Sequence, residues 1–317
     1  MGRKNMVEIF GTSVPIEEAR ANAKARAREG KKPGQNLIVI LIATAVVFFI
    51  DHFISSYASY IITAVGKLFN NGEDKTAMFL ENYRMNVFLY LTIVPIILYI
   101  LYAKIFEKRK ITTLGFIKKN MPVSYLMGIG IAILLMGFAA GFCVITGAMT
   151  IKAEGMSAVS LLIYISGWLI QGLSEEVMCR GFLMTSIARR YSVTLGVIIN
   201  SVLFAVLHLG NPGITALAFA NLCLFGLFMS LLFIRTDSIW ACAACHSVWN
   251  LMQGNILGIP VSGLNMPMVF SSTFNNKLEL INGGSFGLEG GLGVTLMLLI
   301  ACSILFISIR KRNEKAA

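Results

Sequence analysis

Eight long apolar stretches alternate with short polar breaks along the 317-residue chain. About 20 apolar residues in a row are enough to cross the hydrocarbon core of a bilayer as an α-helix. The breaks carry charged or turn-forming residues, as at Asn211-Pro212-Gly213 and Arg235-Thr236-Asp237. The stretches run roughly over residues 37–57, 84–103, 123–147, 156–180, 193–209, 214–234, 239–257 and 291–309. This pattern predicts an all-α fold, a polytopic membrane protein with about eight transmembrane helices.

The composition excludes a water-soluble protein. Hydrophobic residues make up 56% of the chain and charged residues only 14%, whereas about 25% of residues are charged in soluble domains. Asp51 and His52 interrupt the first apolar stretch, and we expect them at the membrane interface rather than in a site. The protein is therefore expected to have the lipid bilayer as its main partner.

The basic residues are distributed unevenly between the two sides of the predicted bundle. In an alternating eight-span arrangement, 21 of the 27 Lys and Arg residues lie on the side of the termini. By the positive-inside rule both termini are cytoplasmic, so the net charge of +11 is mostly a topology signal and does not indicate nucleic-acid binding. The predicted organisation is a basic cytoplasmic N-terminal segment (1–36), a transmembrane domain (37–312) with an external loop (258–290), and a cytoplasmic tail (313–317). Residues 16–28 predict a short helix, solvated near the headgroups.

A few ionisable and amide side chains lie inside the apolar stretches. Charge inside hydrocarbon is costly, so such residues indicate a functional site. Glu176 and Arg180 are spaced i, i+4 and can pair along one helix face, which leaves Glu175 free to face elsewhere. His208 ends the stripe Asn200–Phe204–His208, and His246, Asn250 and Gln253 form a second stripe.

These side chains also match in depth. If the fourth helix continues to Arg190, Glu175 lies 15 residues before the turn, and His208 lies 15 residues after Val193. Both then lie roughly 22 Å from the hairpin tip. His246 lies eight residues after Ser238, roughly 12 Å below the cytoplasmic boundary, so its depth agrees only if the hairpin projects about 10 Å into the cytosol. With that projection, which Arg189 and Arg190 favour, we expect Glu175, His208, His246 and Asn250 to meet in a cavity that opens to the cytosol.

Such a set of side chains is suited to hydrolysis. A desolvated carboxylate can act as general base towards water, and His and Asn side chains can donate hydrogen bonds to an oxyanion. One Glu with two His could instead bind zinc, through Glu175, His208 and His246. The H-E-x-x-H spacing is absent, and the pattern alone does not choose between metal and metal-free chemistry. Packing and interhelical hydrogen bonding are the alternative for each residue taken singly.

The three motifs resemble those of the CPBP family, which comprises the type II CAAX prenyl endopeptidases and bacterial relatives tied to bacteriocin processing and immunity. They are Glu-Glu-x-x-x-Arg (175–180), Phe-x-x-x-His (204–208) and His-x-x-x-Asn (246–250), in that order on successive predicted helices. The similarity covers about residues 108–255, with Leu114-Gly115-Phe116 as a further point of likeness.

The resemblance implies a glutamate-dependent intramembrane endopeptidase of a bacterial cytoplasmic membrane, acting on a peptide or membrane-protein substrate. Glu175 would be the general base with His208 as its partner, and His246 and Asn250 would bind the oxyanion. Glu176 and Arg180 would support the site, and a zinc ion stays open. Two alternatives stand beside it: a proton- or solute-coupled transporter, and a non-catalytic bacteriocin-immunity or binding protein. The chain shows neither a repeated half nor matched broken helices, which disfavours a transporter.

Overall fold

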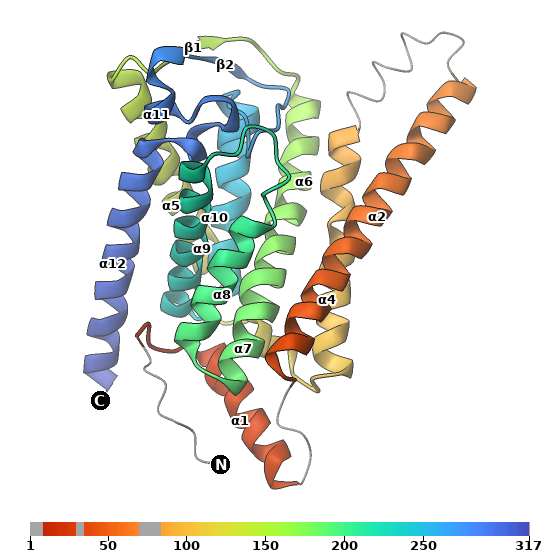
Figure 1. The fold of residues 1–317 in the computed structure, drawn as a ribbon, viewed down its shortest axis with the longest axis vertical. Coiled ribbons are helices and arrows are strands. Elements are labelled where there is room, and N and C mark those ends of the chain that lie inside the picture. Colours follow the sequence, from red (N-terminus) through yellow and green to blue (C-terminus); the bar gives the residue numbers. More distant parts are fainter. Residues whose placement is uncertain (1–8, 30–34, 70–83, 317) are drawn as a thin grey trace.

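The computed structural model describes residues 9–29, 35–69 and 84–316 as a bundle of long helices (Figure 1). The α-helices are α1 (Val14–Arg28), α2 (Leu37–Phe69), α4 (Ile93–Ile105), α5 (Met121–Ile145), α6 (Ala158–Glu176), α7 (Thr185–Arg190), α8 (Val193–Val206), α9 (Ala216–Thr236), α10 (Ile239–Leu251), α11 (Glu279–Asn282) and α12 (Leu292–Ala316). Strands β1 (Met149–Ala153) and β2 (Phe270–Phe274) pair antiparallel, with Met149 opposite Phe274. They form the single two-stranded sheet of the described residues, at the end of the bundle opposite the termini (Figure 1).

The predicted all-α polytopic membrane fold is confirmed. Each of the eight apolar stretches contains a helix. Six helices of the described part are long and apolar enough to cross a membrane: Leu37–Ile62, Arg84–Ile105, Met121–Ile145, Ala158–Arg190, Ala216–Thr236 and Leu292–Lys315. Helices α8 and α10 are shorter, so the count of eight spans and the orientation of the termini stay predictions.

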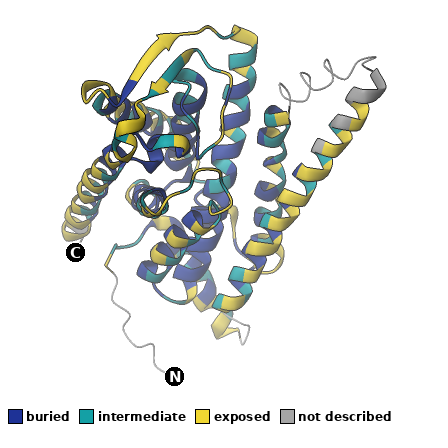
Figure 2. Ribbon diagram, turned by 45° about the horizontal axis from the view of Figure 1, so that its top comes forward, coloured by how far each residue is buried: buried dark blue, intermediate teal, exposed yellow. Residues whose placement is uncertain are grey.

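The outer faces of the bundle expose large apolar side chains. Phe53 on α2 is 71% exposed, Leu134 on α5 is 74% exposed and Ile304 on α12 is 62% exposed. Figure 2 shows α2 and α12 exposed along much of their length, whereas many of the buried residues lie on the helices between them. Apolar surface on this scale marks contact with lipid.

Helix α10 lies between α5 and α6, and glycines allow this close approach. A Cβ on Gly128 of α5 would collide with the backbone of Ala241, and a Cβ on Gly172 of α6 would collide with Ser247. Small residues let helix backbones meet in a membrane bundle. The approach brings the His246 helix directly against the Glu175 helix.

The fourth apolar stretch is one continuous helix. Helix α6 passes at Val177 into the π-helical segment η2 (Val177–Met184) and then into α7. Together they span Ala158–Arg190, which extends beyond the predicted stretch 156–180 and includes the continuation to Arg190 on which the expected match in depth depends. A second π-helical segment, η3 (Met252–Ile256), directly follows α10. Such π segments are rare and often occur at functional sites.

The two chain ends are joined at one end of the bundle (Figure 1). Helix α1 packs on α7 and on the 3-10 turn η1 (Ile111–Leu114), and Ile16 is fully buried there. The short helix predicted over residues 16–28 is present as α1, but it is not freely solvated, because its apolar positions Ile16, Ala19 and Ala23 are buried against the bundle. Arg312 of α12 donates to the Thr12 carbonyl at 2.7 Å and pairs with Asp237 at 3.3 Å.

The segment 258–290 is folded into the bundle and is more than a simple loop. It contains β2, α11 and short 3-10 turns, and Phe286 and Glu289 are buried in it. Asn221 of α9 holds its end by donating to the carbonyls of Glu289 at 2.8 Å and Gly291 at 3.0 Å. These contacts join residues far apart in the chain, so sequence periodicity gave no sign of them.

Candidate active site

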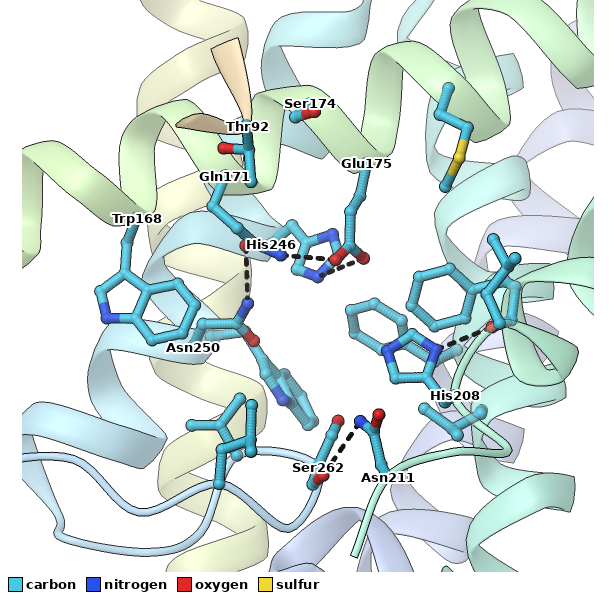
Figure 3. A pocket seen from close by; sticks show the side chains of 18 of the residues that line it. Thr92, Trp168, Gln171, Ser174, Glu175, His208, Asn211, His246, Asn250 and Ser262 are labelled. Carbon is cyan, nitrogen blue, oxygen red and sulfur yellow. Dashed lines mark hydrogen bonds and ion pairs between the residues drawn. The ribbon is translucent and has the colours of Figure 1, made fainter. Parts of the chain in front are cut away.

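A partly open cavity of about 170 Å³ lies between α2, the span Arg84–Ile105, α6, α8, α9 and α10 (Figure 3). It is closed on one side by residues of the segment 258–290. A single water needs about 10–15 Å³ by this kind of measure, so the cavity can hold a water and part of a substrate together. Four residues singled out from the sequence line it: Glu175, His208, His246 and Asn250.

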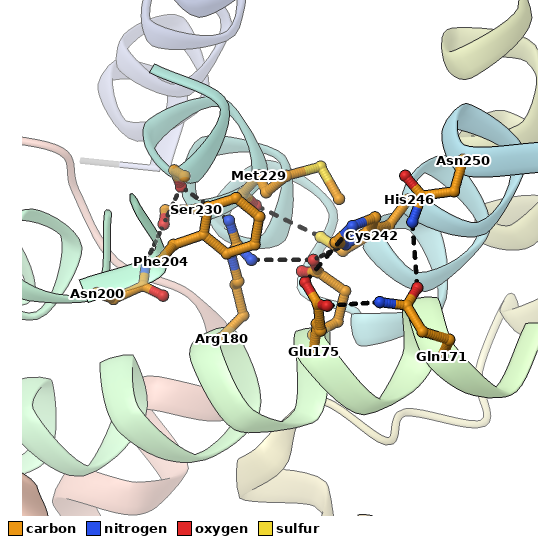
Figure 4. A network of polar contacts seen from close by, with 12 residues as sticks. Gln171, Glu175, Arg180, Asn200, Phe204, Met229, Ser230, Cys242, His246 and Asn250 are labelled. Atoms are coloured by element: carbon orange, nitrogen blue, oxygen red, sulfur yellow. Dashed lines mark hydrogen bonds and ion pairs between the residues drawn. The ribbon is translucent and has the colours of Figure 1, made fainter. Parts of the chain in front are cut away.

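Glu176 and Arg180 lie behind the cavity wall and are both fully buried. Arg180 Nη1 pairs with Glu176 Oε1 at 2.9 Å, the i, i+4 contact that the spacing predicted. Arg180 Nη2 also donates to the Gly226 carbonyl at 3.1 Å, and the guanidinium lies 5.2 Å from the Phe204 ring centroid. Figure 4 shows Arg180 directed between the helices rather than into the cavity. This pair therefore ties α6, α8 and α9 together.

His246 lies between two glutamates. Its Nδ1 is 2.8 Å from Glu176 Oε1, and its Nε2 is 3.7 Å from Glu175 Oε2. The Phe225 ring packs edge-on against the imidazole at 5.3 Å. The buried Glu176 carboxylate fixes the ring orientation and leaves Nε2 directed towards Glu175.

Glu175 and Asn250 are linked through Gln171 on α6. Gln171 donates through Nε2 to Glu175 Oε1, and its Oε1 accepts from Asn250 Nδ2 at 3.1 Å (Figures 3 and 4). The Glu175 side chain is 25% exposed, unlike Glu176 beside it. Glu175 is thus the glutamate of the pair that reaches the cavity.

His208 lies just beyond the end of α8, across the cavity from Glu175 (Figure 3). Its Nδ1 is 2.8 Å from the Phe204 carbonyl. A carbonyl oxygen only accepts, so Nδ1 carries the hydrogen and the neutral ring has a free lone pair on Nε2. Glu175 and His208 make no direct ion pair or hydrogen bond, although both line the cavity.

The two polar stripes are buried as expected, but they do not enter the cavity along their whole length. Asn200 donates to Ser230 at 2.6 Å, and Gln253 donates to the Pro260 carbonyl at 2.6 Å. These two residues hold the helices and the segment 258–290 in place.

The residues considered for zinc do not form a metal site in this arrangement. Among the described residues, no group of three His, Cys, Asp or Glu side chains is placed to hold a metal ion. Glu175 and His246 lie near each other, but His208 does not join them as a third ligand. The donor set therefore does not fit the tetrahedral three-ligand site that a catalytic zinc needs.

Sequence reasoning missed several residues of the cavity wall. Gln171 lies one helical turn before Glu175, so its i, i+4 spacing was a usable signal. Glu289 accepts from the Ser262 backbone and hydroxyl, both at 2.8 Å, and from Trp249 Nε1 at 3.3 Å. Asn211 donates to the Ser262 carbonyl at 3.0 Å (Figure 3). A lone carboxylate in a segment without periodicity offers no comparable signal.

Asp51 was expected at the membrane interface, and that expectation is wrong. It is only 8% exposed and lines the cavity from α2, inside the candidate span Leu37–Ile62. Helix α2 continues to Phe69 without a break at this carboxylate.

Comparison with known families gives one match. Residues 157–252 match the family described as type II CAAX prenyl endopeptidase Rce1-like. The matched segment begins at the N-cap of α6 and ends just after α10, so it contains Glu175, His208, His246 and Asn250. Comparison with curated proteins finds no match to the chain. The chain is therefore a multi-pass membrane protein whose residues 157–252 are similar to the type II CAAX prenyl endopeptidase Rce1-like family.

Proposed function

We propose that the protein is an intramembrane endopeptidase that hydrolyses a peptide bond of a peptide or membrane-protein substrate, with Glu175 as the general base. The supporting observation is that four motif residues line one cavity: Glu175 from α6, His208 from just beyond the end of α8, and His246 and Asn250 from α10. The family match of the segment that carries them points to the same class of reaction.

The proposed reaction starts with a water between Glu175 and His208. Glu175 takes one proton from it, while the Nε2 lone pair of His208 accepts a hydrogen bond from the other. The hydroxide forms a bond to the scissile carbonyl carbon. The bond from that carbon to nitrogen then breaks, and Glu175 returns its proton to the leaving nitrogen. Both groups are held for this task, Glu175 by Gln171 and His208 by the Phe204 carbonyl.

His246 and Asn250 would stabilise the developing oxyanion. Asn250 donates one N–H to Gln171 Oε1, so its second N–H is available to a group in the cavity. His246 directs Nδ1 at the Glu176 carboxylate, so it can also donate from Nε2 only when the ring carries both protons. Glu176 and Arg180 would act as positioning residues, because Glu176 holds the His246 ring, Arg180 holds Glu176, and neither lines the cavity.

Because the three candidate ligands do not form a metal site, the proposed steps use side chains alone. A chelator should leave the hydrolysis rate of the reconstituted protein unchanged. Loss of activity with the chelator, restored by zinc, would contradict this part of the proposal.

The basic residues around the termini support a place for the reaction near the cytoplasmic face of a membrane, in bacteria the cytoplasmic membrane. The experiment compares the peptides of cells that produce the wild type, Glu175→Gln or His208→Ala, with Glu154→Gln as control. Glu154 is an exposed glutamate at the end of β1, remote from the motifs. The cleavage products found in cells with the wild type should be absent from cells with Glu175→Gln or His208→Ala and present in cells with the control Glu154→Gln. Their persistence with Glu175→Gln at wild-type protein levels would overturn the proposal.

A further inference from the structure

The wall of the cavity that α2 forms carries a carboxylate, Asp51, which has no role in the proposed reaction. Asp51 lines the cavity from α2, facing the helices that carry the motifs. The side chain is more than nine-tenths buried, and its Oδ1 has no hydrogen-bond partner among the described residues. Burial of an unpartnered carboxylate oxygen is unfavourable, so a buried carboxylate normally has a donor or a cation beside it.

The ionisable side chains that line the cavity are carboxylates and histidines, so apart from any protonated histidine its charges are negative. Three carboxylates line it, from Asp51, Glu175 and Glu289, and no Lys or Arg of the described chain does. Glu175 accepts from Gln171, and Glu289 accepts from Ser262 and Trp249. Of these three carboxylates, Asp51 is the one with a buried oxygen that accepts no hydrogen bond from the described residues.

Asp51 and Glu175 line the same cavity, so their like charges repel each other, and His52, which also lines the cavity, offsets part of the charge on Asp51 only when its ring is protonated. A cation placed beside Asp51 would remove this repulsion and leave the oxygens of Glu175 available for a water. A neutral donor would satisfy the free oxygen of Asp51 but would not offset the repulsion.

We propose that Asp51 forms a subsite for a positively charged side chain, Lys or Arg, of the substrate. The inference rests on the proposed function and names a substrate class for it, a peptide segment with a basic residue near the scissile bond. Phe48, Phe88 and Pro95 line the same cavity and supply apolar surface that the aliphatic stem of such a side chain can contact. A free substrate carboxylate has no Lys or Arg to meet here, which favours cleavage within a chain.

The first test uses a position-scanning peptide library, cleaved by the reconstituted protein and read by mass spectrometry. The wild type and the control Glu154→Gln should favour Lys or Arg at one position by about tenfold or more. Asp51→Asn should lose that preference while still cleaving other peptides. Asp51→Lys should favour Glu or Asp at the same position. An unchanged preference in Asp51→Asn would overturn the inference, as would a wild type with no basic preference.

A binding measurement separates failure of this inference from failure of the proposed function. The probe is n-butylguanidinium, an analogue of the arginine side chain, with n-butanol as its neutral counterpart. The guanidinium should raise the melting temperature of the wild type and of Glu175→Gln, and its apparent affinity should fall about tenfold or more in Asp51→Asn. Absence of cleavage with this binding intact would refute only the proposed function. Equal binding to Asp51→Asn and wild type, or no binding at all, would refute the subsite.

Discussion

Two walls of the cavity differ in how their buried carboxylates are paired. In the motif wall, formed by α6, α8 and α10, the fully buried Glu176 has both the Arg180 guanidinium and the His246 ring within 3 Å. In the α2 wall, Asp51 is nearly as buried, and its Oδ1 has no partner among the described residues. Glu176 also has one oxygen without a partner, Oε2, but its charge is offset by the Arg180 guanidinium at Oε1, and no Lys or Arg of the described residues lines the cavity beside Asp51. The first wall is thus organised before any substrate arrives, whereas the second lacks a partner that a substrate can supply.

The difference has a structural basis in how the two walls pack. Helix α10 lies against glycines of α5 and α6, which fixes the motif residues within a dense core. Helix α2 lies at the edge of the bundle and is exposed along much of its length (Figure 2). Reaction chemistry requires groups held in place, and a recognition site tolerates a more loosely held helix.

The largest effect is expected from breaking the ion pair of the motif wall. Arg180→Met leaves Glu176 buried without its guanidinium, which should cost about 3–5 kcal/mol of stability. Thermal unfolding in detergent measures this, with Lys311→Met, which removes an exposed cation on α12, as the matched control. Equal melting temperatures for the two variants would show that the pair does not organise the wall.

A smaller effect is expected where the segment 258–290 joins the motif wall. Glu289→Ala leaves the Ser262 N–H and the Trp249 indole N–H without their acceptor. Each orphaned donor should cost about 1–3 kcal/mol, mostly as local opening. Hydrogen exchange at residues 258–266 should become faster, while exchange in α5 stays unchanged. Unaltered exchange at 258–266 would show that Glu289 does not anchor this segment.

The smallest effect on stability is expected in the α2 wall. Asp51→Asn keeps the shape of the side chain and removes an uncompensated charge, so the melting temperature should stay the same or rise, with a change of about 1 kcal/mol or less. Glu176→Gln, the same change in the motif wall, should destabilise clearly because Arg180 then lacks its counter-charge. Equal destabilisation by both would abolish the distinction between the walls.

The fold and the motif wall were largely predictable from the sequence, because both rest on helical periodicity. Apolar stretches located the helices, and i, i+4 spacing gave the pair of Glu176 and Arg180 and separated Glu175 from it. Asp51 was misplaced because a single charge inside an apolar stretch does not reveal whether it faces headgroups or a cavity. Glu289 and Ser262 were missed because their contact depends on how a segment without periodicity folds back on α9 and α10.

The two π-helical segments, η2 and η3, were also not predictable from the sequence. Residues 177–184 contain Arg180 and Gly181, and residues 252–256 contain Gln253, Gly254 and Asn255, but nothing in their spacing marks the change from α-helix to π-helix. Close packing of α8 and α10 against these segments is a tertiary effect, so it becomes visible only in the assembled bundle.

The central claim is that Glu175 activates a water for peptide hydrolysis. The most direct measurement is the rate at which purified, reconstituted protein incorporates ¹⁸O from labelled water into new carboxyl termini of a cleaved peptide. Loss of a general base typically costs about 10²–10⁴-fold, so Glu175→Gln should lower this rate by that factor while its melting temperature stays near that of the wild type. An unchanged rate of ¹⁸O incorporation in a folded Glu175→Gln variant would contradict the account.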